Sequence, residues 1–250
     1  MKVTLIQSNI VWGDAGANCL KASEAIGATP GSDLYILPEM FSTGFATEPE
    51  GLAESDCFSL GWMRDKARET GAAIYGSVAT EEGGRYFNRF YFVTPDGAEV
   101  HYDKHHLFTF GGEHHRYTGG DSRVEVVWKG FRIRLAVCYD LRFPGWVRNT
   151  GDTPYDLLIY VASWPSVRRH AWDALLRARA IENQCYLAGV NRVGSEPSGL
   201  EYEGGTVLLD PWGKEIARCA DHSEECATAT IDLEPLQSFR KQFPVLKDAD

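Results

Sequence analysis

Three strand-like runs that lie far apart in the sequence each lead into a residue with a reactive side chain. The runs DLYIL, EVHYD and IRLAV are followed by Glu39, Lys104 and Cys138. In α/β folds ligands bind beyond the carboxyl ends of strands, so we expect these three side chains to converge on one site. A carboxylate, an ammonium and a thiol together suit the covalent hydrolysis of an amide. The chain must therefore fold so that three distant strand ends meet.

Turn signals and apolar periodicity divide the chain into short elements. Strands are predicted at Val3–Gln7, Leu34–Leu37, Ala73–Ala79, Tyr86–Thr94, Glu99–Asp103, Val124–Trp128, Ile133–Val137, Leu157–Ala162, Tyr186–Asn191, Thr206–Asp210 and Ala227–Ile231. Helices are predicted at Ala17–Ile26, Ser59–Thr70, Pro144–Asn149 and His170–Cys185. We expect the final stretch, Leu233–Asp250, to extend along the surface or onto a partner subunit.

The order of these elements narrows the fold class. Early strands alternate with helices, whereas the middle and the C-terminal third are rich in hairpin signals. This mixture disfavours both a doubly wound sheet and a (β/α)₈ barrel, and it favours mixed sheets covered by helices. The 250 residues contain no linker-like segment and no internal repeat, so we expect one α/β domain spanning residues 1–250.

Composition excludes several classes of function. The net charge of −10 leaves no basic field for nucleic-acid phosphates. No uncharged apolar stretch reaches the roughly 20 residues that cross a bilayer, and the apolar run near the N-terminus is too short for a signal peptide. The six cysteines are scattered without CxxC pairs. We therefore expect a cytoplasmic protein with reduced thiols and with neither a nucleic-acid nor a membrane partner.

Cys138 has the sequence context of an activated nucleophile. It lies where a strand stops and a helix begins, with Pro144 near the helix start. A sharp strand-to-helix turn exposes a nucleophile and leaves the next backbone N–H free to bind an oxyanion. An ammonium about 4 Å from a thiol lowers the thiol pKa by about 3 units at an effective dielectric near 20, and Lys104 could supply it. Glu39 acts in the opposite direction, so we expect Cys138 and Glu39 to share one proton.

Four longer motifs resemble the nitrilase superfamily of carbon–nitrogen hydrolases. They are LPEMFSTGF, YDKHHLFTFGGEHHRYTGG, CYDLRFP and ARAIENQCYLAGVNRVG, and the resemblance covers nearly the whole chain. It implies a four-layer α-β-β-α sandwich of two mixed β-sheets. It also implies a catalytic triad of Glu39, Lys104 and Cys138, no metal or organic cofactor, and a homodimer in which two sandwiches pack together.

Within the superfamily, the motifs MFSTGF, GEHHRY and CYDLRFPGW are most similar to those of the omega-amidase branch. Enzymes of that branch hydrolyse 2-oxoglutaramate, or the related 2-oxosuccinamate, to the dicarboxylic oxo acid and ammonia through a cysteine thioester. The resemblance gives Glu113 the role of orienting Lys104 or the substrate amide. It makes the backbone N–H of Tyr139 and the ammonium of Lys104 the oxyanion donors. Ser163 departs from the family's usual Asn-Trp-Pro sequence, so no side-chain amide contact is carried over to it.

A small anionic substrate needs a local positive patch inside this acidic protein. Basic candidates are His114, His115, Arg116, Arg142 and the run Arg168-Arg169-His170. Arginine can hold a carboxylate with two parallel hydrogen bonds, although Arg142 could equally be the partner of a structural ion pair. Aromatic candidates for the pocket wall are Phe41, Phe45, Phe108, Phe110, Tyr117 and Trp164. From these sets we select Phe45, His114, Tyr117, Arg142 and Trp164, and together with the oxyanion donor Tyr139 they are the predicted substrate-binding residues.

Other functions remain open on the sequence. The paired histidines at 105–106 and 114–115 suggest a metal site, but adjacent residues on a strand point to opposite faces and no HExxH or CxxC accompanies them. The same triad could act on N-carbamoyl amines, aliphatic amides or nitriles. A non-catalytic binding protein of the same fold is a further alternative. It would be favoured if iodoacetamide labels Cys138 no faster than the other cysteines.

Overall fold

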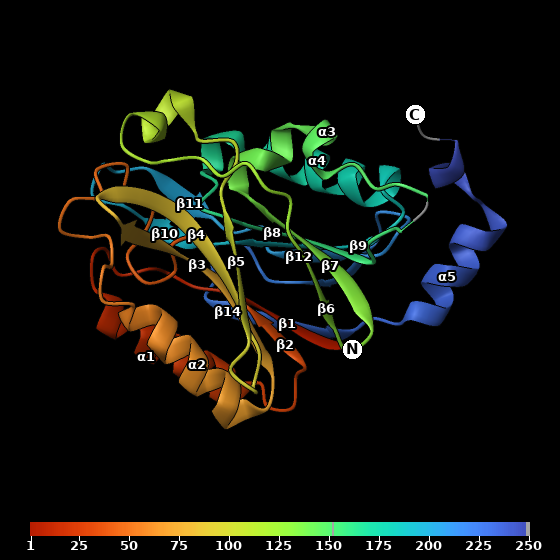
Figure 1. The fold of residues 1–250 in the computed structure, drawn as a ribbon, viewed down its shortest axis with the longest axis horizontal. Coiled ribbons are helices and arrows are strands. Elements are labelled where there is room, and N and C mark those ends of the chain that lie inside the picture. Colours follow the sequence, from red (N-terminus) through yellow and green to blue (C-terminus); the bar gives the residue numbers. More distant parts are fainter. Residues whose placement is uncertain (152, 249–250) are drawn as a thin grey trace.

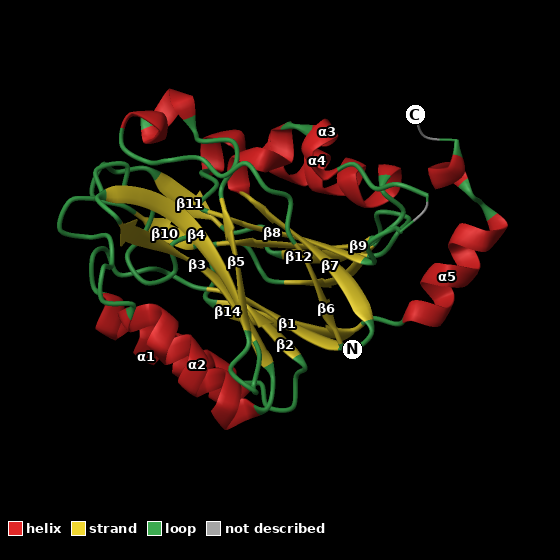
Figure 2. Cartoon of the chain, viewed as in Figure 1, coloured by secondary structure: helices red, strands yellow, loops and turns green. Residues whose placement is uncertain are grey.

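The computed structural model describes residues 1–151 and 153–248. Two six-stranded sheets pack face to face between layers of helices (Figures 1 and 2). The first sheet has the order β14 (Glu225–Thr230), β1 (Lys2–Gln7), β2 (Leu34–Ile36), β3 (Ala73–Glu82), β4 (Arg85–Val93) and β5 (Glu99–Asp103). The second has the order β13 (Glu215–Arg218), β12 (Val207–Leu209), β9 (Tyr186–Asn191), β8 (Leu157–Ala162), β7 (Phe131–Val137) and β6 (Glu125–Trp128). A separate hairpin pairs β10 (Val193–Ser195) with β11 (Glu201–Glu203).

The helices form the two outer layers. Helices α1 (Ala15–Ala28) and α2 (Phe58–Thr70) cover the first sheet, and α3 (Pro144–Val147) and α4 (Arg169–Glu182) cover the second, while α5 (Leu233–Gln242) lies beside the edge (Figure 1). The described residues also include short 3₁₀ helices, namely η1 (Thr109–Gly111), η2 (Glu113–His115), η3 (Cys138–Arg142), η4 (Ser166–Arg168) and η5 (Val245–Lys247). The expected four-layer α-β-β-α sandwich is confirmed.

Strand direction explains why the reactive residues meet. Strand β2 is parallel to β3, and β5 runs in the same direction because two antiparallel steps through β4 separate it from β3. In the second sheet β7, β8 and β9 are parallel to one another. The carboxyl ends of the parallel strands within each sheet therefore share one edge. Glu39 and Lys104 follow strands of the first sheet, and Cys138 follows β7 of the second.

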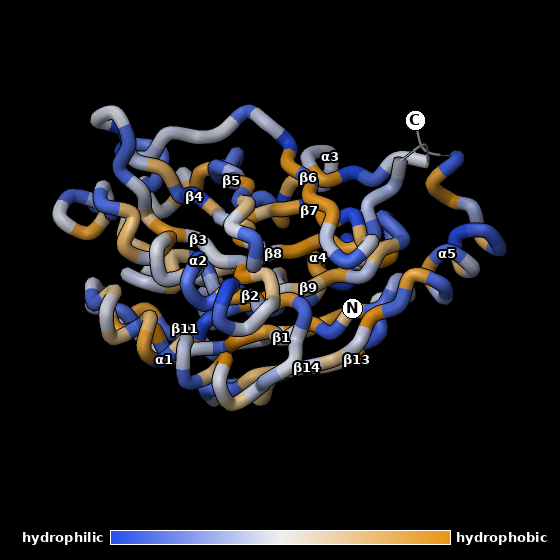
Figure 3. Tube along the Cα trace, turned by 60° about the horizontal axis from the view of Figure 1, so that its bottom comes forward, coloured by the Kyte–Doolittle hydropathy of each residue, from blue (hydrophilic) through white to orange (hydrophobic). Residues whose placement is uncertain are grey.

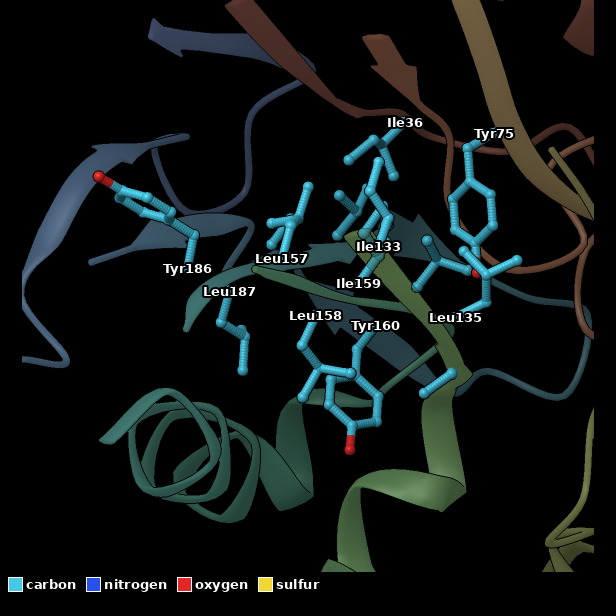
Figure 4. Packing of buried hydrophobic residues seen from close by; sticks show 14 of the residues in the cluster. Ile36, Tyr75, Ile133, Leu135, Leu157, Leu158, Ile159, Tyr160, Tyr186 and Leu187 are labelled. Atoms are coloured by element: carbon cyan, nitrogen blue, oxygen red, sulfur yellow. The ribbon is translucent and has the colours of Figure 1, made fainter. Parts of the chain in front are cut away.

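The main core lies between the sheets and continues from the second sheet to α4. Along β1, Val3 and Leu5 face the second sheet, whereas Ile6 packs against α1, as the two-residue period of a strand requires. Figure 3 shows the most hydrophobic segments running through interior strands such as β8. In Figure 4, Ile36 of the first sheet points toward Ile133 of the second, while Leu158 points away toward the helices.

The structure differs from the sequence predictions in several element ends, in three strands that were not predicted and in the C-terminal segment. Strands β10, β11 and β13 were not predicted, and the predicted helix ending at Cys185 ends at Glu182. The C-terminal segment, expected to extend along the surface or onto a partner subunit, is helical over Leu233–Gln242, and most of the residues of this helix are exposed or half-buried; positions 249–250 lie outside the described residues. The carboxylate of Asp232 caps this helix by accepting a hydrogen bond from the N–H of Glu234, and Leu236 is buried. Of the helices in the described part of the chain, none combines the length and apolar character needed to span a bilayer.

Candidate active site

Glu39, Lys104 and Glu113 form a buried ionic cluster where the two sheets meet. The ammonium of Lys104 lies 3.0 Å from Glu39 Oε1 and 2.9 and 3.1 Å from the two carboxylate oxygens of Glu113. All three side chains are inaccessible to solvent. Lys104 is fixed between the two carboxylates by charge-assisted hydrogen bonds, the strongest class available to it.

Asn88, which the sequence interpretation missed, connects the two carboxylates. Its side-chain amide donates to Glu39 Oε1 at 2.8 Å and to Glu113 Oε1 at 3.2 Å. Asn88 lies in the middle of β4, where a buried polar residue interrupts the aromatic run YFNRFYF. That interruption is the signal that could have identified it. We call Glu39, Asn88, Lys104 and Glu113 the inner charge centre.

Glu39 is also held from the second sheet. The backbone N–H of Ser163, just after β8, donates to Glu39 Oε2 at 2.7 Å. Each oxygen of the Glu39 carboxylate therefore has a fixed donor, and the contact from Ser163 comes from its backbone. A hydrogen bond that links residues 124 positions apart orients this carboxylate relative to both sheets.

Cys138 occupies a strained turn between β7 and η3. Its φ is +39°, in the left-handed region that residues with a Cβ rarely adopt. Asp140 stabilises this turn, because its carboxylate accepts from the N–H of Val137 at 3.1 Å, the N–H of His106 at 3.0 Å and the hydroxyl of Tyr102 at 2.8 Å. The sequence analysis did not identify Asp140, although it lies within the CYDLRFP motif. The turn sets Tyr139 in the first turn of η3, where backbone N–H groups lack intrahelical partners.

The electrostatics of the site keep the proton on sulfur. Burial raises the pKa of the Cys138 thiol well above its ordinary value and the charge of Glu39 raises it further, while Lys104 offsets only part of this. Burial acts to lower the pKa of Lys104, but the carboxylates of Glu113 and Glu39 outweigh it and the net shift is upward. Burial raises the pKa of Glu113 despite the neighbouring ammonium. The cation of Lys104 is thus neutralised mainly by carboxylates, and thiolate formation requires transfer of the proton to a base.

A cavity of about 300 Å³ opens above Cys138. Its lining residues are Trp12, Phe45, Thr47, Glu48, Phe108, Gly111, Cys138, Tyr139, Arg142, Ser163, Trp164, Pro165, Arg168, Glu196, Pro197, Ser198, Leu200 and Tyr202. Four of the six predicted substrate-binding residues are among them, namely Tyr139, Phe45, Arg142 and Trp164. Cys138 is 9% exposed and lines this cavity, so the nucleophile is recessed within it.

The other two predicted binding residues lie outside the cavity lining. His114 is exposed to solvent on η2, and Tyr117 is buried with its hydroxyl donating to the backbone carbonyl of Ala46. His105 and His106 have structural contacts: the ring of His105 stacks on Trp146, and His106 contacts Asp140. Within residues 1–151 and 153–248, no group of three or more His, Cys, Asp or Glu side chains could hold a metal ion.

From the sequence, Arg142 could be either a carboxylate-binding residue or the partner of a structural ion pair, and no such ion pair is present among the described residues. Its guanidinium lies 4.9 Å from the centroid of the Trp164 ring, and it has no carboxylate partner in the part of the chain that the structure describes. An aromatic face attracts a cation without neutralising it. Arg142 therefore presents free donors to the cavity that contains Cys138.

Comparisons with known proteins agree with this geometry. The family profile described as "Carbon-nitrogen hydrolase" matches residues 2–241. The chain is 44% identical to Omega-amidase YafV of Escherichia coli K12, with 100% of this chain and 97% of that protein covered. It is 33% identical to 2-oxoglutaramate amidase of Bacillus subtilis, with 98% and 96% covered. A solved CN-hydrolase superfamily protein from Xanthomonas campestris is 43% identical and superposes with a TM-score of 0.97, covering 100% of this chain and 97% of that chain. This chain therefore belongs to the carbon–nitrogen hydrolase family, within the nitrilase superfamily, and is a hydrolase of carbon–nitrogen bonds.

Proposed function

We propose that this chain is an omega-amidase that hydrolyses the terminal amide of 2-oxoglutaramate to 2-oxoglutarate and ammonia. The observation that carries the chemistry is a recessed cysteine beside a carboxylate that is itself bonded to a buried lysine. The choice of substrate is supported by the full-length similarity to the omega-amidase of E. coli and the 2-oxoglutaramate amidase of B. subtilis.

The first half of the reaction forms a thioester on Cys138. The sulfur attacks the amide carbon while its proton passes to Glu39, since the raised pKa of the thiol requires a base. The developing oxyanion is stabilised by the backbone N–H of Tyr139 and by the ammonium of Lys104. Glu39 then gives the proton to the amide nitrogen, the carbon–nitrogen bond breaks, and ammonia leaves.

The second half returns the enzyme to its starting state. Glu39 takes a proton from water, the water oxygen attacks the thioester carbon, and the carbon–sulfur bond breaks. The proton held by Glu39 returns to the sulfur, and the carboxylic acid leaves. Glu113 and Asn88 contribute by holding the reacting side chains in place. Glu113 accepts a hydrogen bond from Lys104, and Asn88 donates to both Glu39 and Glu113.

The cavity suits a small anionic amide. A volume of about 300 Å³ lies at the lower end of the ~300–1,000 Å³ range of small-molecule sites. We assign Arg142 to the substrate carboxylate, because its guanidinium lines the cavity without a partner among the described residues. Phe45 and Trp164 wall the cavity and reduce the access of water.

Domain organisation, assembly and location complete the proposal. We infer a single domain across residues 1–250, supported by a family match over 2–241. We also infer a homodimer, the assembly that the resemblance to the nitrilase superfamily implies. The six cysteines are all free, which favours a cytoplasmic location.

Acyl-enzyme mass spectrometry tests the proposed reaction. With 2-oxoglutaramate we expect an acyl adduct on the wild-type protein, no adduct and no ammonia from Cys138→Ala, and unchanged turnover in a control Cys57→Ala variant at an exposed thiol. Absence of ammonia release from 2-oxoglutaramate would refute the proposed substrate. Faster turnover of an N-carbamoyl amine, an aliphatic amide or a nitrile would assign the same chemistry to a different substrate.

A further inference from the structure

Two adjacent arginines near the cavity have opposite environments. Arg169 is buried and forms ion pairs with three carboxylates, at 2.8 Å to Asp173, 3.1 Å to Asp221 and 3.5 Å to Glu203. Arg168 has no ion pair, and its guanidinium makes no hydrogen bond within residues 1–151 and 153–248. Arg169 is a structural residue, whereas the charge of Arg168 is unmatched.

Aromatic rings hold Arg168 at the cavity. Its guanidinium carbon lies 5.2 Å from the centroid of Phe108 and 5.9 Å from that of Phe110. Arg168 ends η4, immediately after the Ser163-Trp164-Pro165 segment, and it lines the same cavity as Cys138. Contact with ring faces orients a guanidinium while leaving its N–H edge free to donate.

Neither of the two carboxylates that line the cavity forms an ion pair with Arg168 among the described residues. Glu48 pairs with Arg116 at 2.8 Å. Glu196 accepts from the hydroxyls of Ser198 at 2.7 Å and Tyr202 at 2.8 Å. The lining therefore presents two carboxylates and two guanidinium groups, and among the described residues no ion pair joins any of the four to another.

Arg168 is half-buried and lines the cavity, so an anion that enters the cavity can become its ion-pair partner. A guanidinium presents paired donors that match the two oxygens of a carboxylate. We propose that Arg168 is a second carboxylate-binding residue of the active site, acting with Arg142 to select amides that carry a carboxylate over neutral amides. This inference rests on the proposed function for the reaction, and it adds the residue that determines specificity.

Protection of Cys138 from alkylation tests the inference without requiring turnover. The probe is 2-oxoglutarate, and the readout is the concentration that halves the rate of carbamidomethylation of Cys138 by iodoacetamide. The variants are Arg168→Met, which keeps an apolar stem on the rings, and Arg168→Lys, which keeps the charge but loses the paired donors. Arg85→Met is the matched control, because Arg85 also lies over an aromatic ring, that of Phe87, but outside the cavity lining.

We expect the half-protecting concentration to rise about 10- to 100-fold in Arg168→Met, by less in Arg168→Lys, and by less than about twofold in Arg85→Met. Alkylation without 2-oxoglutarate reports whether the site is intact, and it should stay within about twofold of the wild-type rate in all three. Unchanged protection in Arg168→Met, or no protection of the wild type, would overturn the inference. Lack of turnover of 2-oxoglutaramate would instead refute the proposed substrate, and the protection assay would still decide the role of Arg168.

Discussion

The charged groups of the inner charge centre are paired with one another, whereas the two arginines that line the cavity above it have no carboxylate partner among the described residues. In the inner charge centre every ionised group has a partner, since Lys104 contacts two carboxylates and Asn88 donates to both of them. In the cavity, Arg142 and Arg168 lie over aromatic rings without carboxylate partners among the described residues. The ion pairs of the inner charge centre are therefore already formed in the free protein, whereas the cavity arginines gain a carboxylate partner when an anion binds.

This difference separates two tasks of an amidase. Groups that move protons must be held in fixed geometry before the substrate arrives, and buried, fully bonded side chains provide this. Groups that recognise a charged substrate contribute most when their own charges are unmatched in the free protein. Substitutions in the inner charge centre should therefore reduce kcat and stability, whereas substitutions of the cavity arginines should weaken the binding of anions.

Removal of the buried cation should have the largest effect. Lys104→Met leaves two buried carboxylates without a counter-ion, so we expect a loss of about 3–5 kcal/mol in the free energy of unfolding. Loss of a charged oxyanion donor should also lower kcat by at least ~10²–10³. Urea denaturation and ammonia release measure the two effects. Adding Glu113→Gln should restore part of the stability but none of the activity, and wild-type stability in Lys104→Met would contradict the account of the centre.

Loss of the bridge between the two carboxylates should have a smaller effect. Asn88→Leu removes the amide that donates to Glu39 and Glu113, and we expect kcat to fall about 10- to 100-fold while KM changes less than about threefold. Steady-state kinetics with 2-oxoglutaramate provide the measurement. Asn88→Asp adds a negative charge at the same place and should shift the pH profile of kcat as well. A rise in KM alone would assign Asn88 to substrate binding instead of positioning.

Substitution of a cavity arginine should change binding more than chemistry. For Arg142→Met we expect KM for 2-oxoglutaramate to rise about 10-fold, with kcat within about threefold of wild type. The kcat/KM for a neutral amide should stay nearly constant, because that substrate has no carboxylate. If Arg142→Met lowers kcat/KM equally for anionic and neutral amides, the cavity arginines do not act in anion binding and the distinction between the two regions fails.

The smallest effect concerns stability in alkaline solution. The pKa of Cys138 is raised in the folded protein, so the folded state keeps a proton that the unfolded chain loses above about pH 8.5. Stability should therefore fall as the pH rises beyond that value, by roughly 1 kcal/mol per pH unit for this group. Cys138→Ala should show a shallower decline between pH 9 and 10.5 in thermal denaturation. Parallel curves for the two proteins would mean that the thiol titrates normally.

Much of the fold could be predicted from sequence because its strands are marked by local patterns. The predicted bounds of Glu99–Asp103, Leu157–Ala162 and Tyr186–Asn191 match the structure, and the three reactive residues lie together at strand ends as expected. The helix α5 was missed because only ten residues form it and its support comes from distant residues: Leu236 is buried, and Arg240 donates to the backbone carbonyls of Gln184 and Tyr155. Such tertiary support is not visible in local periodicity.

The missed and misplaced site residues share a physical cause. Asn88 contacts the site because the register of β4 against β3 pairs it with Ala79, and register between strands cannot be derived from a single strand. His114 was predicted to line the cavity, but successive residues of a 3₁₀ helix point about 120° apart, so Glu113 faces inward and His114 outward. The same divergence between neighbours separates Arg168 from Arg169.

The left-handed backbone at Cys138 has a consequence for how this chain can change over time. A residue with a side chain in that conformation loses roughly 1 kcal/mol or more relative to glycine. Replacing the nucleophile with glycine should therefore yield a sturdier protein with no hydrolytic activity. Selection for folding stability alone would therefore favour glycine at this position. A cysteine is kept there at a cost in the free energy of unfolding, because the reaction requires its thiol.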